Sequence, residues 1–172
     1  YLDTLMDPCY GARITRVVDG NATCRNRYQK EPPWSADGRI LHLTKGCSVF
    51  MDGNTYKRLS LKRVPALGHW HPTEPDIQVY LDGNTIGRFN VRTGENQIVT
   101  RSESYSKFSY VGEGVISGNG RWVAPFAHKG GKQVTFAYDM VEKKKYPDID
   151  LTGWIIDWVS ISYSGKYVLA NG

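Results

Sequence analysis

One pattern of eight residues occurs three times in this chain and constrains its fold more than any other feature. The copies are Trp34–Leu41, Ile116–Val123 and Ile161–Val168. Each has an apolar residue, Ser, any residue, then Asp, Asn or Ser, followed by Gly, a basic residue and two apolar or aromatic residues. A tight hairpin turn needs a positive φ, which Gly adopts without steric cost and Asn or Asp tolerates, and the Ser hydroxyl can bond a backbone N–H inside the turn. The pattern therefore predicts, at three places, the end of one strand, a turn and the start of the next strand.

The spacing of the copies indicates a repeated unit. Gly120 follows Gly38 by 82 positions, and Gly165 follows Gly120 by 45. If the longer interval holds two repeats, the period is about 41 to 45 residues, which matches the roughly 40–45 residues of a four-stranded propeller blade. A degenerate fourth copy is expected near residue 75, where Trp70–Ile77 carries a longer turn. Similar hairpins in an ordinary β-sandwich are the alternative.

The sequence thus predicts an all-β chain folded as a β-propeller of about three and a half four-stranded blades, in an incomplete ring. We expect a lead-in and a single outer strand at 1–27, with 1–11 irregular and a strand over 12–19. The blades are expected at 28–64, 65–104, 105–151 and, in part, 152–172. Their strands are predicted at 29–34, 40–44, 48–51, 56–62, near 69, 77–81, 86–91, 97–101, 109–116, 122–126, 133–139, 144–148, 155–161 and 167–170.

An incomplete ring has consequences for assembly, because natural rings have roughly four to eight blades. Open sheet edges invite association. Either the chain is the amino-terminal part of a longer protein, which its first residue Tyr1 also suggests, or two copies pair through the open ends of the propeller. We expect a fragment that associates with itself.

Composition and charge exclude several classes of protein. Hydrophobic residues make up 40% of the chain, which argues against disorder, and no apolar run approaches the roughly 20 residues of a membrane span. The net charge of +5 is not by itself the mark of a nucleic-acid-binding protein. The basic run Lys143–Lys145 is interpreted as a solvated turn in preference to a phosphate-binding patch. We therefore expect no membrane and no nucleic-acid partner.

Three cysteines, Cys9, Cys24 and Cys47, show no metal-binding spacing, and their odd number argues against a disulfide framework. A Cys9–Cys24 bridge stays open as a possibility in an oxidising compartment. The glycosylation triplet Asn21–Thr23 is used only as a sign of a loop.

The three copies of the pattern resemble the repeats of TolB-type β-propellers, over residues 12–172. The segment from Asp7 to Arg16, followed by Tyr28–Lys30 and the Ser-Ala-Asp-Gly turn, is similar to the opening of oligogalacturonate lyases. Those enzymes are propellers that hold a divalent metal near the central channel through His residues. The resemblance implies a metal site of this kind. We expect a periplasmic or extracellular location in preference to the cytoplasm.

His69-Trp70-His71 is the stretch that could carry such chemistry. On a strand, residues two apart face the same side, so both imidazoles could meet one divalent metal. Gln78 and His42 are the nearest candidates in sequence for a third ligand. The alternative is that His71 replaces the Ser of the other turns and that His69 packs at a blade edge.

Trp70 and Asp157 are further candidates for contact with a ligand. Tryptophans 34, 70 and 158 are expected mainly to pack between blades, and Asp157 either faces the channel or bonds the next blade. No nucleophile elbow, phosphate-binding loop or carboxylate pair is present, so no catalytic residue is assigned. The sequence therefore favours a binding or scaffold module for a protein or glycan partner, without a cofactor. The alternatives are a carbohydrate-active enzyme with a His-bound divalent metal and a purely structural half of a larger propeller.

Overall fold

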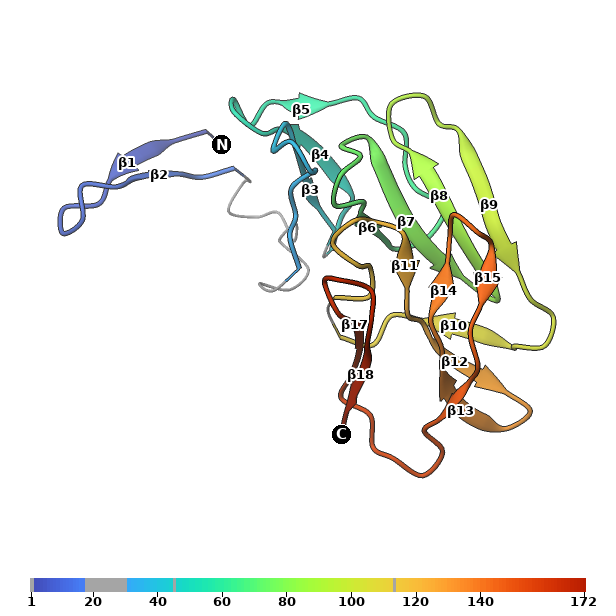
Figure 1. Cartoon of the computed structure of the whole chain (residues 1–172). Coiled ribbons are helices and arrows are strands. Elements are labelled where there is room, and N and C mark those ends of the chain that lie inside the picture. The colour runs from blue at the N-terminus through green and yellow to red at the C-terminus, as the bar shows by residue number, and fades with distance from the viewer. Residues whose placement is uncertain (1, 18–30, 45, 113) are drawn as a thin grey trace.

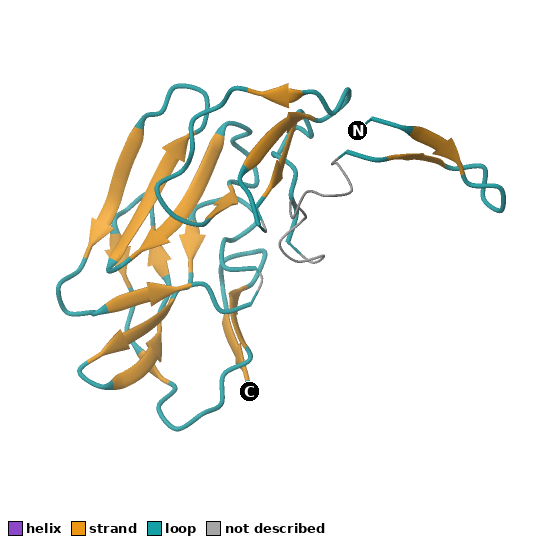
Figure 2. Ribbon diagram, turned by 180° about the vertical axis from the view of Figure 1, so that it is seen from behind, coloured by secondary structure: helices purple, strands orange, loops and turns teal. Residues whose placement is uncertain are grey.

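The computed structural model describes residues 2–17, 31–44, 46–112 and 114–172, and these residues form strands and turns without a helix. Their strands make six antiparallel sheets, and the two sheets within residues 107–150 alternate along the chain (Figures 1 and 2). The predicted all-β class is confirmed. Among the described residues no helix could cross a membrane.

The two sheets that come after the N-terminal hairpin, which we call the first and the second sheet, follow the expected strands closely. The first sheet pairs β3 (Ile40–Leu43), β4 (Val49–Asp52) and β5 (Arg58–Leu59), and Trp34 bridges to Leu41 at its edge. The second sheet has the order β6 (Gly68–Trp70), β7 (Ile77–Asp82), β8 (Thr85–Asn90) and β9 (Asn96–Arg101). Strand β5 is shorter than the predicted 56–62. The first residues of the predicted strand 29–34 lie outside the described part.

The third region differs from the prediction of four unbroken strands, because it forms two sheets. One has the order β10 (Lys107–Ser109), β12 (Phe126–Lys129), β13 (Lys132–Thr135) and β16 (Ile149–Asp150). The other joins β11 (Trp122–Val123), β14 (Tyr138–Asp139) and β15 (Lys144–Lys145), and Ile116 bridges to Val123. Pro125 stands between β11 and β12. Proline has no N–H to give to a ladder, which explains why the predicted strand 122–126 is interrupted there.

The last sheet consists of β17 (Trp158–Ile161) and β18 (Val168–Asn171). At the other end, β1 (Thr4–Met6) pairs with β2 (Arg13–Thr15) in a hairpin that lies apart from the other sheets (Figure 1). The prediction of an irregular lead-in was therefore wrong for residues 4–6. Asp7 accepts hydrogen bonds from the N–H groups of Cys9 and Tyr10 at 2.8 and 2.9 Å, so the expected chain breakers form a hairpin turn instead.

The repeated pattern forms the same turn each time. The N–H of Gly38, Gly120 and Gly165 donates to the carbonyl of the Ser three residues before it, at 2.9, 2.8 and 2.8 Å. The three glycines have φ values of 71°, 72° and 74°. The neighbouring Asp37 and Asn119 do not share the positive φ. Each instead accepts a hydrogen bond from the Ser hydroxyl, at 2.7 Å, and another from the N–H two residues later, at 3.1 Å.

The core lies between consecutive sheets, as in a stack of blades. Ile40 and Phe50 of the first sheet pack with Trp70, Tyr80, Phe89 and Val91 of the second sheet and its edge. The second sheet packs on the third region through a larger cluster, and the third region packs on the last sheet through another. No closed ring forms within the described residues. The buried residues of the largest cluster are Val79, Leu81, Ile86, Val99, Tyr105, Phe108, Val123, Ala127, Val134, Phe136, Tyr138 and Met140.

The cysteines differ from the pairing that the sequence left open. Cys9 is exposed and free, so the Cys9–Cys24 bridge does not form. Cys47, just before β4, is disulfide-bonded. Spacing alone could not decide this, because a bridge depends on which segments the fold brings together.

Candidate ligand site between the inner strands

The first strands of three successive sheets converge on one cavity, which we call the inner-strand pocket. Its volume is about 130 Å³. It takes residues from the edge of the first sheet, from β6 and from the segment that bridges to β11. This is the place that the central channel of a propeller would occupy. The lining residues are Pro32, His69, Trp70, Pro72, Gly114, Val115 and Ile116.

His69 lies on β6 where the second sheet meets the third region. It is half-buried, and its ring centroid is 4.1 Å from that of Tyr110. The hydroxyl of Tyr110 donates to the carbonyl of Val79 at 2.9 Å, which holds the tyrosine against the second sheet. His69 therefore does both things considered from the sequence, since it packs at a sheet boundary and lines the pocket.

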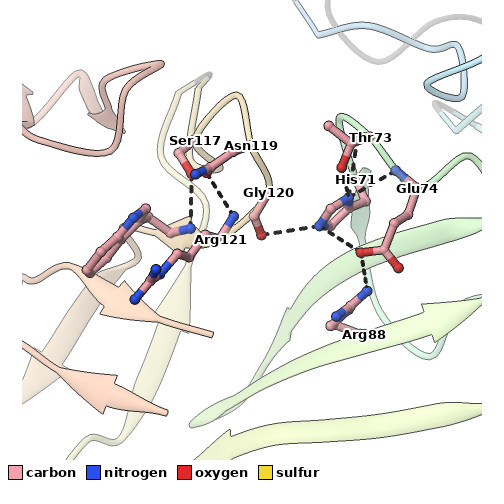
Figure 3. A network of polar contacts seen from close by, with 9 residues as sticks. His71, Thr73, Glu74, Arg88, Ser117, Asn119, Gly120 and Arg121 are labelled. Carbon is pink, nitrogen blue, oxygen red and sulfur yellow. Dashed lines mark hydrogen bonds and ion pairs between the residues drawn. The ribbon is translucent and has the colours of Figure 1, made fainter. Parts of the chain in front are cut away.

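His71 is buried in a polar network between two turns (Figure 3). Its Nδ1 accepts hydrogen bonds from the N–H groups of Glu74, at 3.1 Å, and Thr73, at 3.4 Å. The ring proton therefore sits on Nε2, which lies 3.2 Å from the carbonyl oxygen of Gly120 and 3.3 Å from Oε1 of Glu74. That carboxylate also pairs with Arg88. Burial lowers the pKa of His71 and the charge of Glu74 partly opposes this, so the imidazole is neutral near pH 7.

The role of His71 matches that of the Ser in the other turns. The hydroxyls of Ser35 and Ser117 each accept a hydrogen bond from a backbone N–H of their own turn, at 3.0 Å. The N–H of His71 donates to the carbonyl of Ile77 at 2.9 Å, as the N–H of Ser35 does to that of Ile40 at 2.8 Å. His71 therefore serves as the turn-capping residue of the second sheet.

A smaller cavity of about 20 Å³ adjoins the inner-strand pocket and shares Pro32, His69 and Trp70 with it. Such a volume holds one water molecule. Gln78, which is fully buried, lines this cavity, and within the described part of the chain its Oε1 has no hydrogen-bond partner. A buried carbonyl oxygen without a hydrogen-bond partner favours the binding of a molecule that donates a hydrogen bond to it.

His42 forms the far wall of the smaller cavity. Its Nδ1 accepts a hydrogen bond from Nε2 of Gln78 at 2.9 Å, so its proton lies on Nε2, 3.0 Å from Oγ of Ser48. Burial, and then the positive charge of Arg63, lowers the pKa of His42 to about 4. Beyond His42, a cleft of about 400 Å³ contains Arg63.

The structure brings His42, His69 and Gln78 to one cavity, whereas His71 does not line it. Both ring nitrogens of His42 and of His71 make hydrogen bonds, so a divalent metal on either ring would have to replace one of these bonds. Over 2–17, 31–44, 46–112 and 114–172, no group of three or more His, Cys, Asp or Glu residues could hold a metal. A metal on His69 and His71 stays a prediction.

The two other candidate residues lie in different surroundings. Trp70 is buried, its Nε1 donates to the carbonyl of Pro33 at 2.9 Å, and its ring packs edge-on against Phe50 and His42. It lines both cavities, so packing and contact with a ligand are compatible. Asp157 is exposed just before β17 and is not among the residues that line these cavities.

Pro32 and Gly114–Ile116 line the inner-strand pocket but were not singled out from the sequence. They contribute apolar surface and backbone, and no residue type among them signals chemistry. The one available signal was their position, because each segment directly precedes a turn of the repeated pattern.

No known protein family and no curated protein matches the sequence. Solved structures do resemble the fold. An oligogalacturonate lyase in complex with manganese has a TM-score of 0.67 and 14% identity over 98% of this chain and 58% of its own. Oligogalacturonate lyase from Vibrio parahaemolyticus has a TM-score of 0.61 and 12% identity over 84% of this chain and 45% of its own. TolB from Acinetobacter baumannii has a TM-score of 0.57 and 18% identity over 96% of this chain and 41% of its own.

These similarities concern the fold, because the identities are low. The chain spans about half the length of the structures that it resembles. Those proteins are β-propellers, and the successive antiparallel sheets of this chain superpose on part of them. The chain therefore has the fold of several β-propeller blades, as oligogalacturonate lyase and TolB do.

Proposed function

We propose that this chain is a non-catalytic binding module, forms part of a larger propeller and takes its ligand in the inner-strand pocket. The observation that supports the proposal is the convergence of three inner strands on one cavity with a histidine and a tryptophan in its wall. Binding sites in proteins are typically concave, largely apolar and provided with a few placed polar groups. The pocket has these properties.

The size of the pocket limits what it can hold. A cavity of about 130 Å³ is smaller than the roughly 300–1,000 Å³ of sites for drug-sized ligands. It suits one residue of a longer partner, such as a single sugar ring of a glycan. The charge of +5 favours an acidic glycan, because a basic protein attracts anionic chains. The resemblance to oligogalacturonate lyases makes trigalacturonate the natural probe.

The disulfide at Cys47 supports an oxidising compartment for this function. Disulfides persist in the periplasm and outside the cell and are rare in the cytoplasm. A periplasmic or extracellular glycan is therefore the kind of ligand that we propose, and labelling of free thiols in protein taken directly from cells would test the compartment.

Calorimetric titration with trigalacturonate tests the binding proposal. His69→Phe keeps a ring against Tyr110 but removes the polar nitrogens from the pocket, and we expect at least tenfold weaker binding. His128→Phe is the matched control, because His128 is also half-buried but packs against Phe126 away from the pocket. Equal affinity of the two variants would show that the ligand does not use the pocket.

The same mixture, supplied with Mn²⁺, tests the enzymatic alternative. A lyase would release a product with a new double bond, which absorbs in the ultraviolet. If this product forms at a rate that depends on Mn²⁺ and on His69, the proposal of a non-catalytic module is wrong. Binding without product, weakened by His69→Phe alone, supports it.

A further inference from the structure

A second cavity, which we call the outer pocket, lies where β9 approaches β14 and β15. Its volume is about 210 Å³. Its floor consists of aromatic rings from the core between the second sheet and the third region, namely Tyr105, Phe108, Phe136 and Tyr138. The rings of Tyr105, Phe108 and Phe136 are mutually tilted, with centroids 5.2 to 5.7 Å apart. The cavity therefore has an apolar floor on which a flat ring can lie.

Cationic side chains form the rim of the outer pocket. Arg101, Lys143 and Lys145 line it, and none of its lining residues is acidic. Arg101 and Lys143 form no ion pair with any residue that the structure describes, whereas Lys145 bonds a carboxylate, that of Asp148, at 2.7 Å. The rim thus carries more positive than negative charge.

Asp148 does not cancel this excess of positive charge, because its single carboxylate bonds more than one cationic group. It bonds Lys129 at 2.8 Å and the hydroxyl of Tyr105 in addition to Lys145. Burial opposes its ionisation, but these hydrogen bonds prevail and lower the pKa of Asp148 to about 2. One carboxylate therefore balances two lysines. The network also holds Lys145 over the ring of Phe136, 4.9 Å from its centroid, which fixes one cation at the pocket.

Two features of the lining bear on what the pocket can hold. Tyr138 lines the pocket and is only 5% exposed, but its hydroxyl oxygen is not fully buried. The hydroxyl can therefore bond a group in the pocket. Lys143 has a φ of 52°, a left-handed conformation that a long side chain rarely adopts. A glycine would adopt this φ without strain, so the lysine is the less favourable residue for the turn.

We propose that the outer pocket binds a sugar-sized ring that carries a carboxylate or a phosphate. The aromatic floor receives the apolar face of the ring, Arg101 and Lys143 neutralise the anion, and the hydroxyl of Tyr138 bonds a ring substituent. The volume is too small for a nucleotide and suits one ring. This assigns a role to part of the Lys143–Lys145 turn, which the sequence suggested to be merely solvated. The site is separate from the inner-strand pocket.

Titrations of the whole chain with glucuronate, glucose 6-phosphate and glucose, followed by calorimetry or NMR, test this inference. We expect one or both anions to bind, more weakly as salt is added, and glucose to bind at least tenfold more weakly. Binding of one anion but not the other identifies whether a carboxylate or a phosphate is the group recognised. Absence of anion binding, or equal binding of glucose, overturns the proposal.

Charge-matched variants locate the site. Arg101→Gln and Lys143→Gln should each weaken anion binding at least fivefold, whereas Lys166→Gln, on the exposed turn between β17 and β18, should not. Equal losses of anion affinity in all three variants would indicate nonspecific electrostatic attraction and would overturn the proposal. In a protein that already carries His69→Phe, Arg101→Gln should still weaken anion binding at least fivefold, so failure here is distinguishable from failure of the proposed function.

A second kind of variant separates ligand binding from stability. Lys143→Gly should raise the melting temperature by relieving the left-handed lysine, yet weaken anion binding as much as Lys143→Gln. Tyr138→Phe should keep the fold and weaken binding severalfold. If Lys143→Gly and Tyr138→Phe both bind the anions as well as the unchanged protein, the outer pocket is not their site.

Discussion

The turns at Gly38 and Gly120 have the same internal geometry but different surroundings. Their φ values are 71° and 72°, and each Gly N–H bonds its Ser carbonyl at nearly the same distance. A methyl group added to Gly38 would meet nothing within 4 Å, whereas one added to Gly120 would lie under 3.0 Å from the imidazole of His71. The repeated sequence thus specifies the turn itself. The position of the turn in the array of sheets decides what the turn touches.

The largest expected effect compares alanine at these two glycines. Gly38→Ala should lower the free energy of unfolding by about 1 kcal/mol, because only the left-handed φ opposes it. Gly120→Ala should lower it by about 3 kcal/mol or more, since the methyl group also displaces His71 from the Gly120 carbonyl. Urea denaturation measures both. Equal losses would mean that the two turns have equivalent surroundings and that the contact with His71 contributes nothing.

This contrast also shows what the sequence could predict. The turns were predictable because their hydrogen bonds join residues at most five positions apart, as between Ser117 and Trp122. The strands that flank them followed from the same pattern. Strands that no such turn flanks have no comparable local signal. The strand Thr4–Met6 was not predicted, because the residues of its hairpin turn resembled chain breakers.

The candidate sites depend on contacts between residues far apart in the sequence. His69 was found because two histidines stand two positions apart, but its neighbours Pro32 and Val115 carry no chemical signal. In the outer pocket, Arg101 lies on β9 and Lys143 in the turn between β14 and β15, and no local pattern links them. The role of His71 was one of two open alternatives, because only the fold shows that the Gly120 carbonyl faces its ring.

An intermediate effect is expected when the unusual turn is made like the others. His71→Ser restores the Ser of the pattern, but the short side chain cannot reach the carbonyl of Gly120 and leaves a void. We expect a loss of about 2 kcal/mol in the free energy of unfolding at pH 7.5. Denaturation at several pH values provides the measurement.

The pH dependence identifies the cause of that loss. Since burial lowers the pKa of His71 in the folded state, its contribution is complete above the unfolded pKa of about 6.5 and decreases as the pH falls below that value. The stability difference between the unchanged protein and His71→Ser should therefore shrink between pH 7 and pH 5. His42, whose pKa is lowered to about 4, titrates in both proteins and cancels from the difference. A difference that does not change with pH would contradict a neutral, buried His71.

The smallest effect concerns the Ser hydroxyl at two other turns. Ser117 is fully buried, and its hydroxyl donates to Asn119 at 2.7 Å and accepts from the N–H of Trp122 at 3.0 Å. Ser162 is half-exposed, and its hydroxyl makes longer contacts of 3.1 and 3.3 Å. Ser117→Ala leaves a buried N–H without a partner and should lower the free energy of unfolding by about 1–2 kcal/mol.

Ser162→Ala should lower it by about 0.5 kcal/mol or less, because water can replace the lost hydroxyl at an exposed turn. Thermal unfolding of the two variants side by side measures the difference. The sign of that difference matters more than its size. The Gly120 turn differs from the other turns because a neighbouring sheet buries it. If Ser162→Ala lowered the free energy of unfolding more than Ser117→Ala, that burial would not contribute to the effect of the Ser hydroxyl.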